Sequence, residues 1–406
     1  MFTSLVSVRT LLVAIFVIMA GGGFLSTLIS VRLEAQGANA FTIGLVAAAY
    51  FAGITIGSVR VPQLIARVGH IRSFAAFVSL FSASSLAYSI TMSAPVWGML
   101  RLVDGFMMAG VFVCLESWLN RQASATTRSS ILAAYMIALY GGQALGQFLL
   151  NLGTQQPSLP FVIAAILLSL SVVPVALTKI DQPQMEHIAP FSLRRLYDAS
   201  PLGVIGVLTT GAILGAFYAM GAVFIQRLGM GLAEVAFFTS CVIGGGVALQ
   251  WPLGLLSDRF DRRTVIIGCM GIVLAISIVL SFFSQPSALL FVLGTLFGGF
   301  AFALYPLCVA HSNDHLTEEQ RVGASSGLVL TYSAGAVVGP MIASAGMQVL
   351  GVRGLFATMS AFALVGTLFA LWRAIVGKPV SAEDQGAFQS LPRTTPMVAV
   401  LEVEEE

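Results

Sequence analysis

The chain has 406 residues, of which 57% are hydrophobic and only 9% are charged, and its formal net charge is +2. An ordinary soluble domain carries about 25% charged residues, so this composition excludes a soluble globule of this size. It also excludes a disordered chain, which needs low hydrophobicity and high charge. The small net charge and the lack of a basic stripe argue against binding to nucleic acid. The class that remains is a protein that crosses a membrane many times.

Apolar runs separated by short polar breaks predict twelve membrane-spanning helices, because one span needs about 20 apolar residues. In chain order they cover residues 8–32, 42–65, 72–92, 96–119, 129–153, 159–178, 202–226, 234–256, 263–283, 286–311, 322–348 and 351–376. The longest internal polar stretch divides them six and six. The expected organisation is an N-terminal bundle (1–178), a cytoplasmic linker (179–201), a C-terminal bundle (202–376) and a disordered cytoplasmic tail (377–406).

The basic residues predict the orientation of the chain. With the N-terminus inside, fifteen of the 20 Lys and Arg residues lie in or beside cytoplasmic segments. Only Arg32, Arg227 and Arg353 lie outside, and Arg60 and Arg101 remain within spans. Because cytoplasmic loops carry an excess of Lys and Arg, both termini are expected to be cytoplasmic.

The four cysteines each fall inside an apolar run, with no C-x-x-C spacing. This placement predicts buried small hydrophobic side chains rather than disulfides or metal ligands. We expect neither a metal nor a cofactor, and no nucleotide-binding loop of the form Gly-x-x-x-x-Gly-Lys-Ser/Thr is present.

The two halves of the sequence match each other at one offset of about 192–194 residues. The matches fall on five helices, and they pair Gly53 with Gly245, Gly105-Phe106 with Gly299-Phe300, Cys114 with Cys308, Arg128 with Arg321, and Gly142-x-x-x-Gly146 with Gly335-x-x-x-Gly339. Parallel six-helix repeats are a known transporter architecture, with the substrate site near the membrane midplane between the halves.

The most specific motif is Gly254-Leu255-Leu256-Ser257-Asp258-Arg259-Phe260-Asp261-Arg262-Arg263, between the eighth and ninth spans. It is similar to the loop signature of the major facilitator superfamily, Gly-x-x-x-Asp-Arg-x-Gly-Arg-Arg, with Asp261 at the second Gly position. The counterpart at residues 62–72 keeps Arg67 and Gly69 but has Pro62 and Ala66 at the Gly and Asp positions. A generic, positively charged cytoplasmic loop is the alternative interpretation.

The resemblance covers about residues 8–376 and implies an all-α membrane protein of twelve helices in two pseudo-symmetric bundles. It implies a conformational gating role for Gly254, Asp258, Arg259, Arg262, Arg263, Arg67 and Gly69. Within the superfamily, the stretches 115–120 and 305–314 resemble the bacterial YcaD-like group, which implies a bacterial inner-membrane location. The Pro expected after the second Gly of the fifth-helix antiporter motif is replaced by Gln147.

Charged residues within spans are costly, at about 2.5–3.5 kcal/mol each on the insertion scale, and are candidates for function. Arg101 and Asp104 lie three residues apart on the fourth span and therefore share a helix face. Asp104 is interpreted either as a protonatable coupling site or as a permanent ion pair with Arg101. Glu116 is either a cavity or proton-coupling carboxylate or an interfacial residue that water or Arg121 satisfies.

The tenth span ends in His311 and Asp314, which face the same region as Glu116 if the halves are pseudo-symmetric. His311 is a candidate proton relay because imidazole titrates near neutrality, and the alternative is an ordinary helix end that Asp314 caps. By the resemblance, the candidates for a mixed apolar and hydrogen-bonding substrate cavity are Thr27, Tyr140, Gln143, Gln147, Tyr218, Gln250, Trp251, Tyr305 and Tyr332.

These features predict a secondary transporter that moves a small organic solute by alternating access, with proton coupling as a subsidiary hypothesis. The expected partners are a small-molecule substrate, membrane lipids and protons, and the sequence carries no signal for an oligomeric state. A lipid or lysolipid flippase of the same fold is the alternative. A membrane-embedded enzyme is disfavoured, because none of the four histidines lies in a His-Glu-x-x-His motif.

Overall fold

The computed structural model describes residues 2–124, 127–154, 156–177 and 192–376, and residues 385, 386, 388, 389, 391, 393 and 394 of the C-terminal tail. Regular structure within these residues is entirely helical. The N-terminal half contains α1 (Phe2–Gly22), α2 (Leu25–Ala35), α3 (Ala40–Val68), α4 (His70–Ala87), α5 (Ala94–Gln122), α6 (Arg128–Gly146), a 3₁₀ helix (Gln147–Thr154) and α7 (Leu159–Ala176). After the short α8 (Leu193–Ala199), the C-terminal half contains α9 (Pro201–Arg227), α10 (Leu232–Arg259), α11 (Arg262–Ser281), α12 (Ala288–Asn313), α13 (Glu318–Leu350), a 3₁₀ turn (Gly351–Arg353) and α14 (Gly354–Val376).

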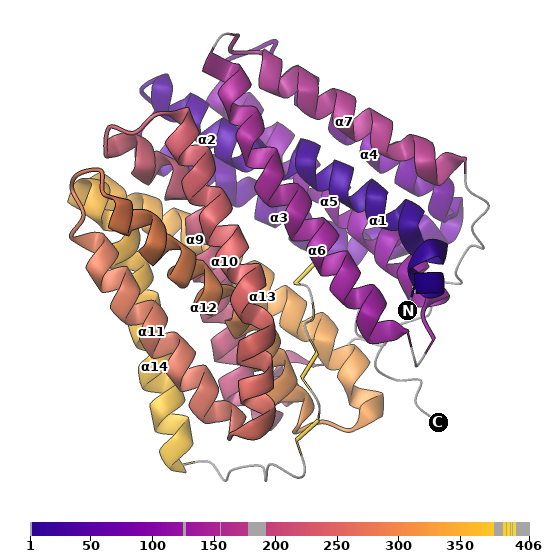
Figure 1. Ribbon diagram of the computed structural model, residues 1–406, viewed down its shortest axis with the longest axis vertical. Helices are drawn as coiled ribbons and strands as arrows, with labels where there is room; N and C mark the ends of the chain where they lie inside the picture. Colours follow the sequence, from indigo (N-terminus) through magenta and orange to yellow (C-terminus); the bar gives the residue numbers. More distant parts are fainter. Residues whose placement is uncertain are drawn as a thin grey trace.

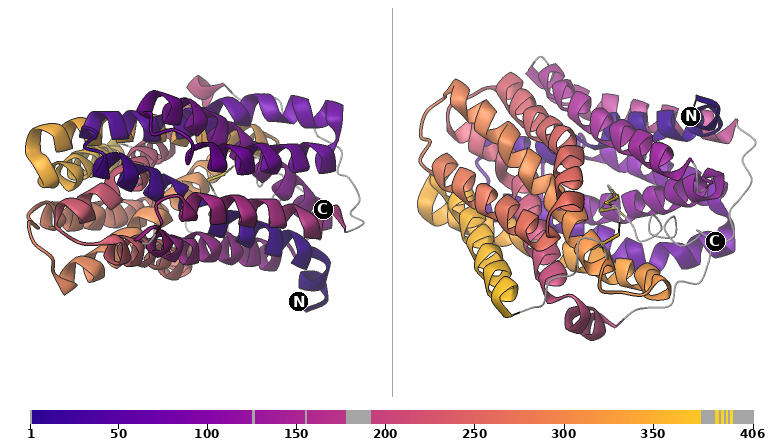
Figure 2. Two further views of the ribbon diagram at one scale, coloured as in Figure 1. Left: turned by 90° about the horizontal axis from the view of Figure 1, so that it is seen from above. Right: turned by 60° about the horizontal axis from the view of Figure 1, so that its bottom comes forward.

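The predicted all-α fold of twelve spans is confirmed. Nine segments of the described chain are long and apolar enough to cross a membrane, and the last of them contains both α13 and α14. Helices α4 and α6 complete the twelve. The N-terminal half forms one bundle and the C-terminal half another, and the two lie side by side (Figures 1 and 2).

Two predicted spans are not continuous α-helices. The first breaks between α1 and α2, where three consecutive glycines, Gly21 to Gly23, lower the helix propensity. Gly21 packs against α7 and Gly22 against the ring of Phe81, so the break lies at close helix contacts. The fifth span ends as a 3₁₀ helix from Gln147 onward.

Glycines set the closest helix contacts in both bundles, and they do so in equivalent places. A Cβ on Gly53 of α3 would collide with the carbonyl of Leu102 on α5, and a Cβ on Gly245 of α10 would collide with that of Thr295 on α12. The predicted pairing of Gly53 with Gly245 is therefore reproduced as equivalent packing. Gly105 of α5 meets the carbonyl of Tyr50, and the equivalent contact in the other bundle is made by Gly298. The structural equivalence is thus shifted by one residue from the Gly299 that the sequence match selects.

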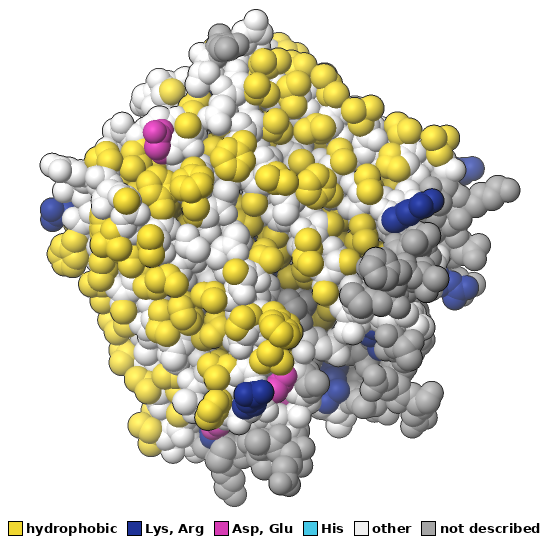
Figure 3. Space-filling model, in the orientation of Figure 1, with side chains coloured by type: hydrophobic (Ala, Val, Ile, Leu, Met, Phe, Trp, Pro, Cys, Tyr) yellow, Lys and Arg dark blue, Asp and Glu magenta, His cyan; other side chains and the backbone are white. Residues whose placement is uncertain are grey.

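The outer surface suits a lipid environment. Hydrophobic side chains are spread over the face in Figure 3, and few charged side chains lie among them. Large apolar residues such as Leu45, Val349 and Ile375 are exposed on helix surfaces. In water an apolar surface of this extent would favour aggregation, whereas a bilayer covers it.

Candidate functional site

At one end of the molecule the two bundles contact each other directly. Arg227 of α9 donates two hydrogen bonds to Glu34 of α2, with N–O distances of 2.7 and 3.0 Å. Ser30 of α2 donates to the carbonyl of Ala219 on α9 at 2.8 Å. Gly44 of α3 packs against Ser344 of α13 so tightly that a Cβ would collide with its side chain. We call this the closed end, and it is defined by Glu34, Arg227, Ser30, Gly44 and Ser344.

At the opposite end, residues of the C-terminal tail lie between the bundles, where they are drawn in yellow in Figures 1 and 2. These residues, 385 to 394 with gaps, belong to the segment for which composition predicts disorder. They are packed instead because the bundle interior supplies hydrogen-bond partners that the composition of the tail does not reveal. We call this end of the molecule the tail end.

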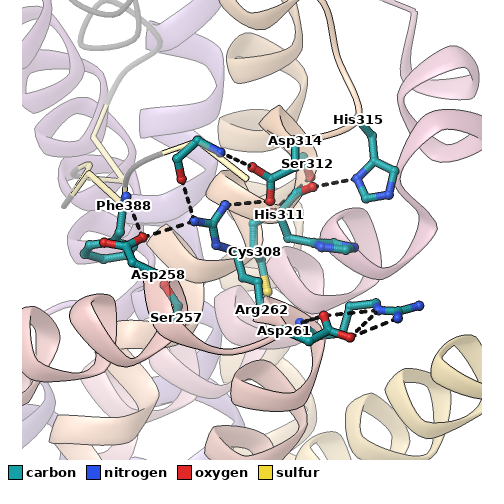
Figure 4. Close-up of polar contacts among 12 residues, drawn as sticks. Ser257, Asp258, Asp261, Arg262, Cys308, His311, Ser312, Asp314, His315 and Phe388 are labelled. Carbon is teal, nitrogen blue, oxygen red and sulfur yellow. Dashed lines mark hydrogen bonds and ion pairs between the residues drawn. The ribbon is translucent and has the colours of Figure 1, made fainter. Parts of the chain in front are cut away.

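Arg262 is the centre of a polar cluster at the tail end (Figure 4). Its side chain is 1% exposed, and it donates to Asp314, which directly follows α12, at 2.5 Å and to Asp258 of α10 at 3.3 Å. Its Nη2 also donates to the carbonyl of Gly386 in the tail at 2.8 Å. The structure therefore joins three residues that the sequence assigns to two separate groups, the loop motif and the end of the tenth span.

The tail completes this cluster. The backbone N–H of Phe388 donates to Asp258 at 2.8 Å, and that of Gly386 donates to Asp314 at 3.1 Å. Gly254 lies against the Phe388 ring, where a Cβ would overlap the ring atoms (Figure 4 shows the position of Phe388). Gly254 and Asp258, which the sequence predicts to act in gating, thus both contact Phe388 of the tail.

Asp261 has a local role that explains its departure from the loop signature. Its carboxylate accepts from the backbone N–H of Arg263 at 3.0 Å and so caps the N-terminus of α11. It also pairs with the Arg263 side chain at 2.9 Å. Burial alone would raise the pKa of Asp261, but the hydrogen bonds and positive charge of Arg263 outweigh it and hold the pKa below its ordinary value.

The remaining gating candidates lie outside these clusters. Arg67 and Arg259 are exposed at the tail-end termini of α3 and α10. Gly69 joins α3 to α4 with a φ of 93°, a left-handed conformation that favours glycine.

Arg101 and Asp104 form the ion pair that their spacing predicts, at 3.6 Å, with side chains 2% and 0% exposed. Tyr88, at the end of α4, donates to Asp104 at 2.6 Å. Arg101 also donates to Ser26 of α2 and stacks over the Tyr50 ring at 4.0 Å. This cluster ties α5 to three neighbouring segments of its own bundle.

Glu116 faces the interior near the tail end. It is 1% exposed, and its Oε1 accepts from Tyr135 of α6 at 2.9 Å. The same oxygen accepts from Thr394 of the tail. Both partners lie far from Glu116 in sequence, so the local sequence showed neither of them.

His311 is buried and its ring lies edge-on to that of His315, with centroids 4.7 Å apart. The His311 side chain lies near the Arg262 cluster (Figure 4). Among the described residues no group of three or more His, Cys, Asp and Glu side chains is placed to hold a metal.

A cavity of about 110 Å³ is lined by residues of both bundles. Four of the predicted cavity residues line it: Tyr140, Gln143, Tyr218 and Tyr332. Tyr218 donates to Gln143 at 3.5 Å and so links the two bundles across the cavity.

The other predicted cavity residues lie elsewhere. Thr27, Gln147 and Gln250 are buried outside the lining, and Tyr305 packs edge-on against Tyr332 with centroids 5.3 Å apart. Trp251 is 70% exposed and shares a helix face with the exposed Leu255. Trp251 therefore points outward instead of into the cavity, about 100° around α10 from the buried Gln250.

Sequence reasoning missed several lining residues, namely Tyr50, Phe112, Ser333, Arg393 and Thr394. The first three are ordinary residues of apolar spans, and no local signal separates them from packing residues. Arg393 and Thr394 were missed because the tail was expected to lie outside the bundles.

The chain matches the family model of the Major Facilitator Superfamily over residues 11–251 and 228–401, which together cover most of its length. The chain belongs to this superfamily. It is a membrane-spanning transporter whose homologues carry the same description.

Two curated relatives are the MFS-type transporters YcaD of Salmonella paratyphi A and Salmonella enteritidis. The first is 28% identical over 378 residues, covering 92% of this chain and 97% of the relative. The second is 29% identical over 354 residues, covering 86% and 91%. The resemblance to the YcaD group is therefore confirmed.

Two solved structures share the fold. A bacterial homologue of the human lysosomal transporter Spinster, inward-facing and unoccupied, has a TM-score of 0.77 at 14% identity and covers 93% of this chain and 98% of its own. The nucleoside transporter NupG has a TM-score of 0.72 at 15% identity and covers 91% and 99%. At these identities the likeness shows the fold alone.

Proposed function

We propose that this protein is a secondary transporter of the bacterial inner membrane and that it moves a small organic molecule by alternating access. In this proposal the two bundles rock about the cavity between them. The observation that carries it is the asymmetry of the two ends: the bundles bind each other at the closed end, while the tail separates them at the tail end.

The positive-inside pattern supports an orientation with the tail end in the cytoplasm. Arg32 and Arg227, two of the three basic residues predicted to lie outside, are both near the closed end. In this orientation the structure corresponds to a state closed to the outside.

The geometry favours Glu116 over Asp104 as the carboxylate for proton coupling. A coupling group must exchange protons with the cavity as access alternates. Asp104 is 0% exposed, is held by Arg101 and Tyr88, and is absent from the cavity lining. Glu116 is also absent from the lining, but it accepts a hydrogen bond from Thr394, which does line the cavity.

Alternating access is tested without knowing the substrate. A Ser333→Cys thiol reports on the cavity in a Cys241→Ser background, which leaves three buried native cysteines. The probe is the membrane-impermeant cation MTSET, applied to right-side-out and inside-out vesicles and read by mass spectrometry. We expect labelling from both faces, because both states are visited.

Cross-linking supplies the mechanistic control. A bismaleimide bridge between Glu34→Cys and Arg227→Cys is expected to abolish labelling from outside and to preserve labelling from inside. A matched bridge between Arg32→Cys and Pro157→Cys lies at the same end but within one bundle, and should leave both unchanged. Labelling from one face only, or external labelling that survives the first bridge, contradicts the proposal.

A further inference from the structure

The described tail residues reach the middle of the molecule. From the Arg262 cluster the tail continues through Leu391, which is 7% exposed, to Arg393 and Thr394, which line the cavity. Figures 1 and 2 show this segment between the two bundles.

Arg393 lies in a cage of aromatic rings. Its guanidinium carbon is 4.3 Å from the ring centroid of Phe302, and 5.6 to 5.8 Å from those of Tyr332, Tyr218 and Tyr140. Its Nη2 donates to the Tyr218 hydroxyl at 3.1 Å. In the described part of the chain no carboxylate forms an ion pair with Arg393, so ring faces and a phenol oxygen hold its charge.

Both bundles contribute to this cage. Tyr140 belongs to α6 of the N-terminal bundle, while Tyr218, Phe302 and Tyr332 belong to α9, α12 and α13 of the other. The Tyr140 and Phe302 rings contact each other across the bundles, with centroids 5.5 Å apart. A site shared between moving halves is placed where a substrate can be bound from either side.

Such a cage selects by charge. A cation over an aromatic face is attracted by the negative charge of the ring face, most strongly when it is desolvated, and aromatic cages recognise ammonium groups in this way. A neutral molecule of the same shape gains none of this attraction. Glu116 accepts a hydrogen bond from Thr394, the residue after Arg393, so a carboxyl group lies next to this part of the tail.

On the basis of the transport function proposed above, we propose that the aromatic cage is the binding site for a substrate bearing a guanidinium or ammonium group. The tail is then an internal competitor that places Arg393 in this site from the tail end. The tail is anchored by its contacts with Asp258, Arg262 and Asp314, which keep Arg393 close and raise its effective concentration above that of a free ligand.

The competition is measured by calorimetric binding to the full-length protein in nanodiscs. The probes are Nα-acetyl-arginine amide, its neutral isostere Nα-acetyl-citrulline amide, and tetramethylammonium. If the tail occupies the cage about 90% of the time, Arg393→Ala tightens binding of the arginine probe about tenfold. Arg393→Lys, which keeps a cation on the tail, should restore competition, and Gln389→Ala serves as the matched tail control with wild-type affinity.

Cation selectivity is measured in the Arg393→Ala background, where the cage is vacant of the tail side chain. The citrulline probe is expected to bind at least tenfold more weakly than the arginine probe. Adding Phe302→Leu, which keeps an apolar side chain of similar size, should weaken both cationic probes about tenfold. Tetramethylammonium distinguishes an ammonium site from one that requires the planar guanidinium.

Three results overturn the inference: equal affinity for the charged and neutral probes, no binding of either cation, or no gain from Arg393→Ala. The vesicle labelling experiment distinguishes a failure of the cage proposal from a failure of the transport proposal. Two-sided labelling without cation binding leaves alternating access standing and removes the cage. Cation binding together with labelling from one face only would leave the cage standing as a cation site and would remove alternating access.

Discussion

The buried pair of Arg101 and Asp104 allows a quantitative test of the packing of α5. In Arg101→Met, the Asp104 carboxylate keeps its hydrogen bond from Tyr88 but loses its counter-charge at a site that is 0% exposed. Breaking a buried pair in this way costs about 3–5 kcal/mol of unfolding free energy. Asp104→Asn keeps an acceptor for Tyr88 and leaves Arg101 over the Tyr50 ring, so its expected loss is smaller, about 1–3 kcal/mol.

The double variant Arg101→Met/Asp104→Asn removes both charges and should lose only about 1–2 kcal/mol, less than Arg101→Met alone. The assay is reversible unfolding in mixed micelles at rising mole fractions of SDS, with the four proteins forming a double-mutant cycle. Arg72→Met, at an exposed arginine, is the control and should stay within about 0.5 kcal/mol of the wild type. Losses that simply add would refute the reasoning, because they would mean that the two charges do not stabilise each other.

Gly44→Leu should overpack the contact with Ser344 and so destabilise the closed end by about 1–3 kcal/mol. External labelling of the Ser333→Cys thiol should then rise severalfold, and unchanged labelling would show that this contact does not keep the protein closed to the outside. Glu116→Gln should abolish proton-driven accumulation of a ligand found by binding, while Asp104→Asn keeps it, and the opposite pattern would reverse the assignment. Asp258→Asn should slow transport with the ligand Kd within about twofold, and an unchanged rate would make Asp258 a surface charge. The folded-state pKa of Asp261 lies below its ordinary value of 3.8, so its stabilisation is present above that pH and lost as pH falls through the lowered pKa. The free energy of unfolding of Asp261→Asn, followed by thermal unfolding, should therefore lie below that of the wild type at pH 7 by less than about 1 kcal/mol, and the difference should shrink as the pH falls through the lowered pKa.

The helical spans were predictable because each is a long apolar run, and a bilayer requires helices to satisfy their backbone groups internally. The repeat was predictable because equivalent close contacts require the same residue type. Gly53 and Gly245 each lie where a Cβ would collide with a backbone carbonyl of the neighbouring helix. The break after Gly22 was harder to predict, because glycines within an apolar run serve equally for close packing and for interruption.

The site was predictable only in part. The ion pair of Arg101 with Asp104 follows from helix periodicity, whereas the partners Tyr88 and Tyr135 come from other helices and give no local signal. Arg393 belongs to a polar tail, and composition describes what such a segment does alone rather than what a cavity offers it.

The most direct test of alternating access is a pair of distance measurements between spin labels on opposite bundles. One pair, Gln36→Cys with Ala233→Cys, reports on the closed end, and the other, Ala66→Cys with Thr264→Cys, reports on the tail end; all four residues are exposed. Double electron–electron resonance in nanodiscs should show two populations at each end. Conditions that lengthen the distance at one end should shorten it at the other. A single unchanging distance at both ends, or changes of the same sign, would contradict the rocking of two bundles about a central cavity.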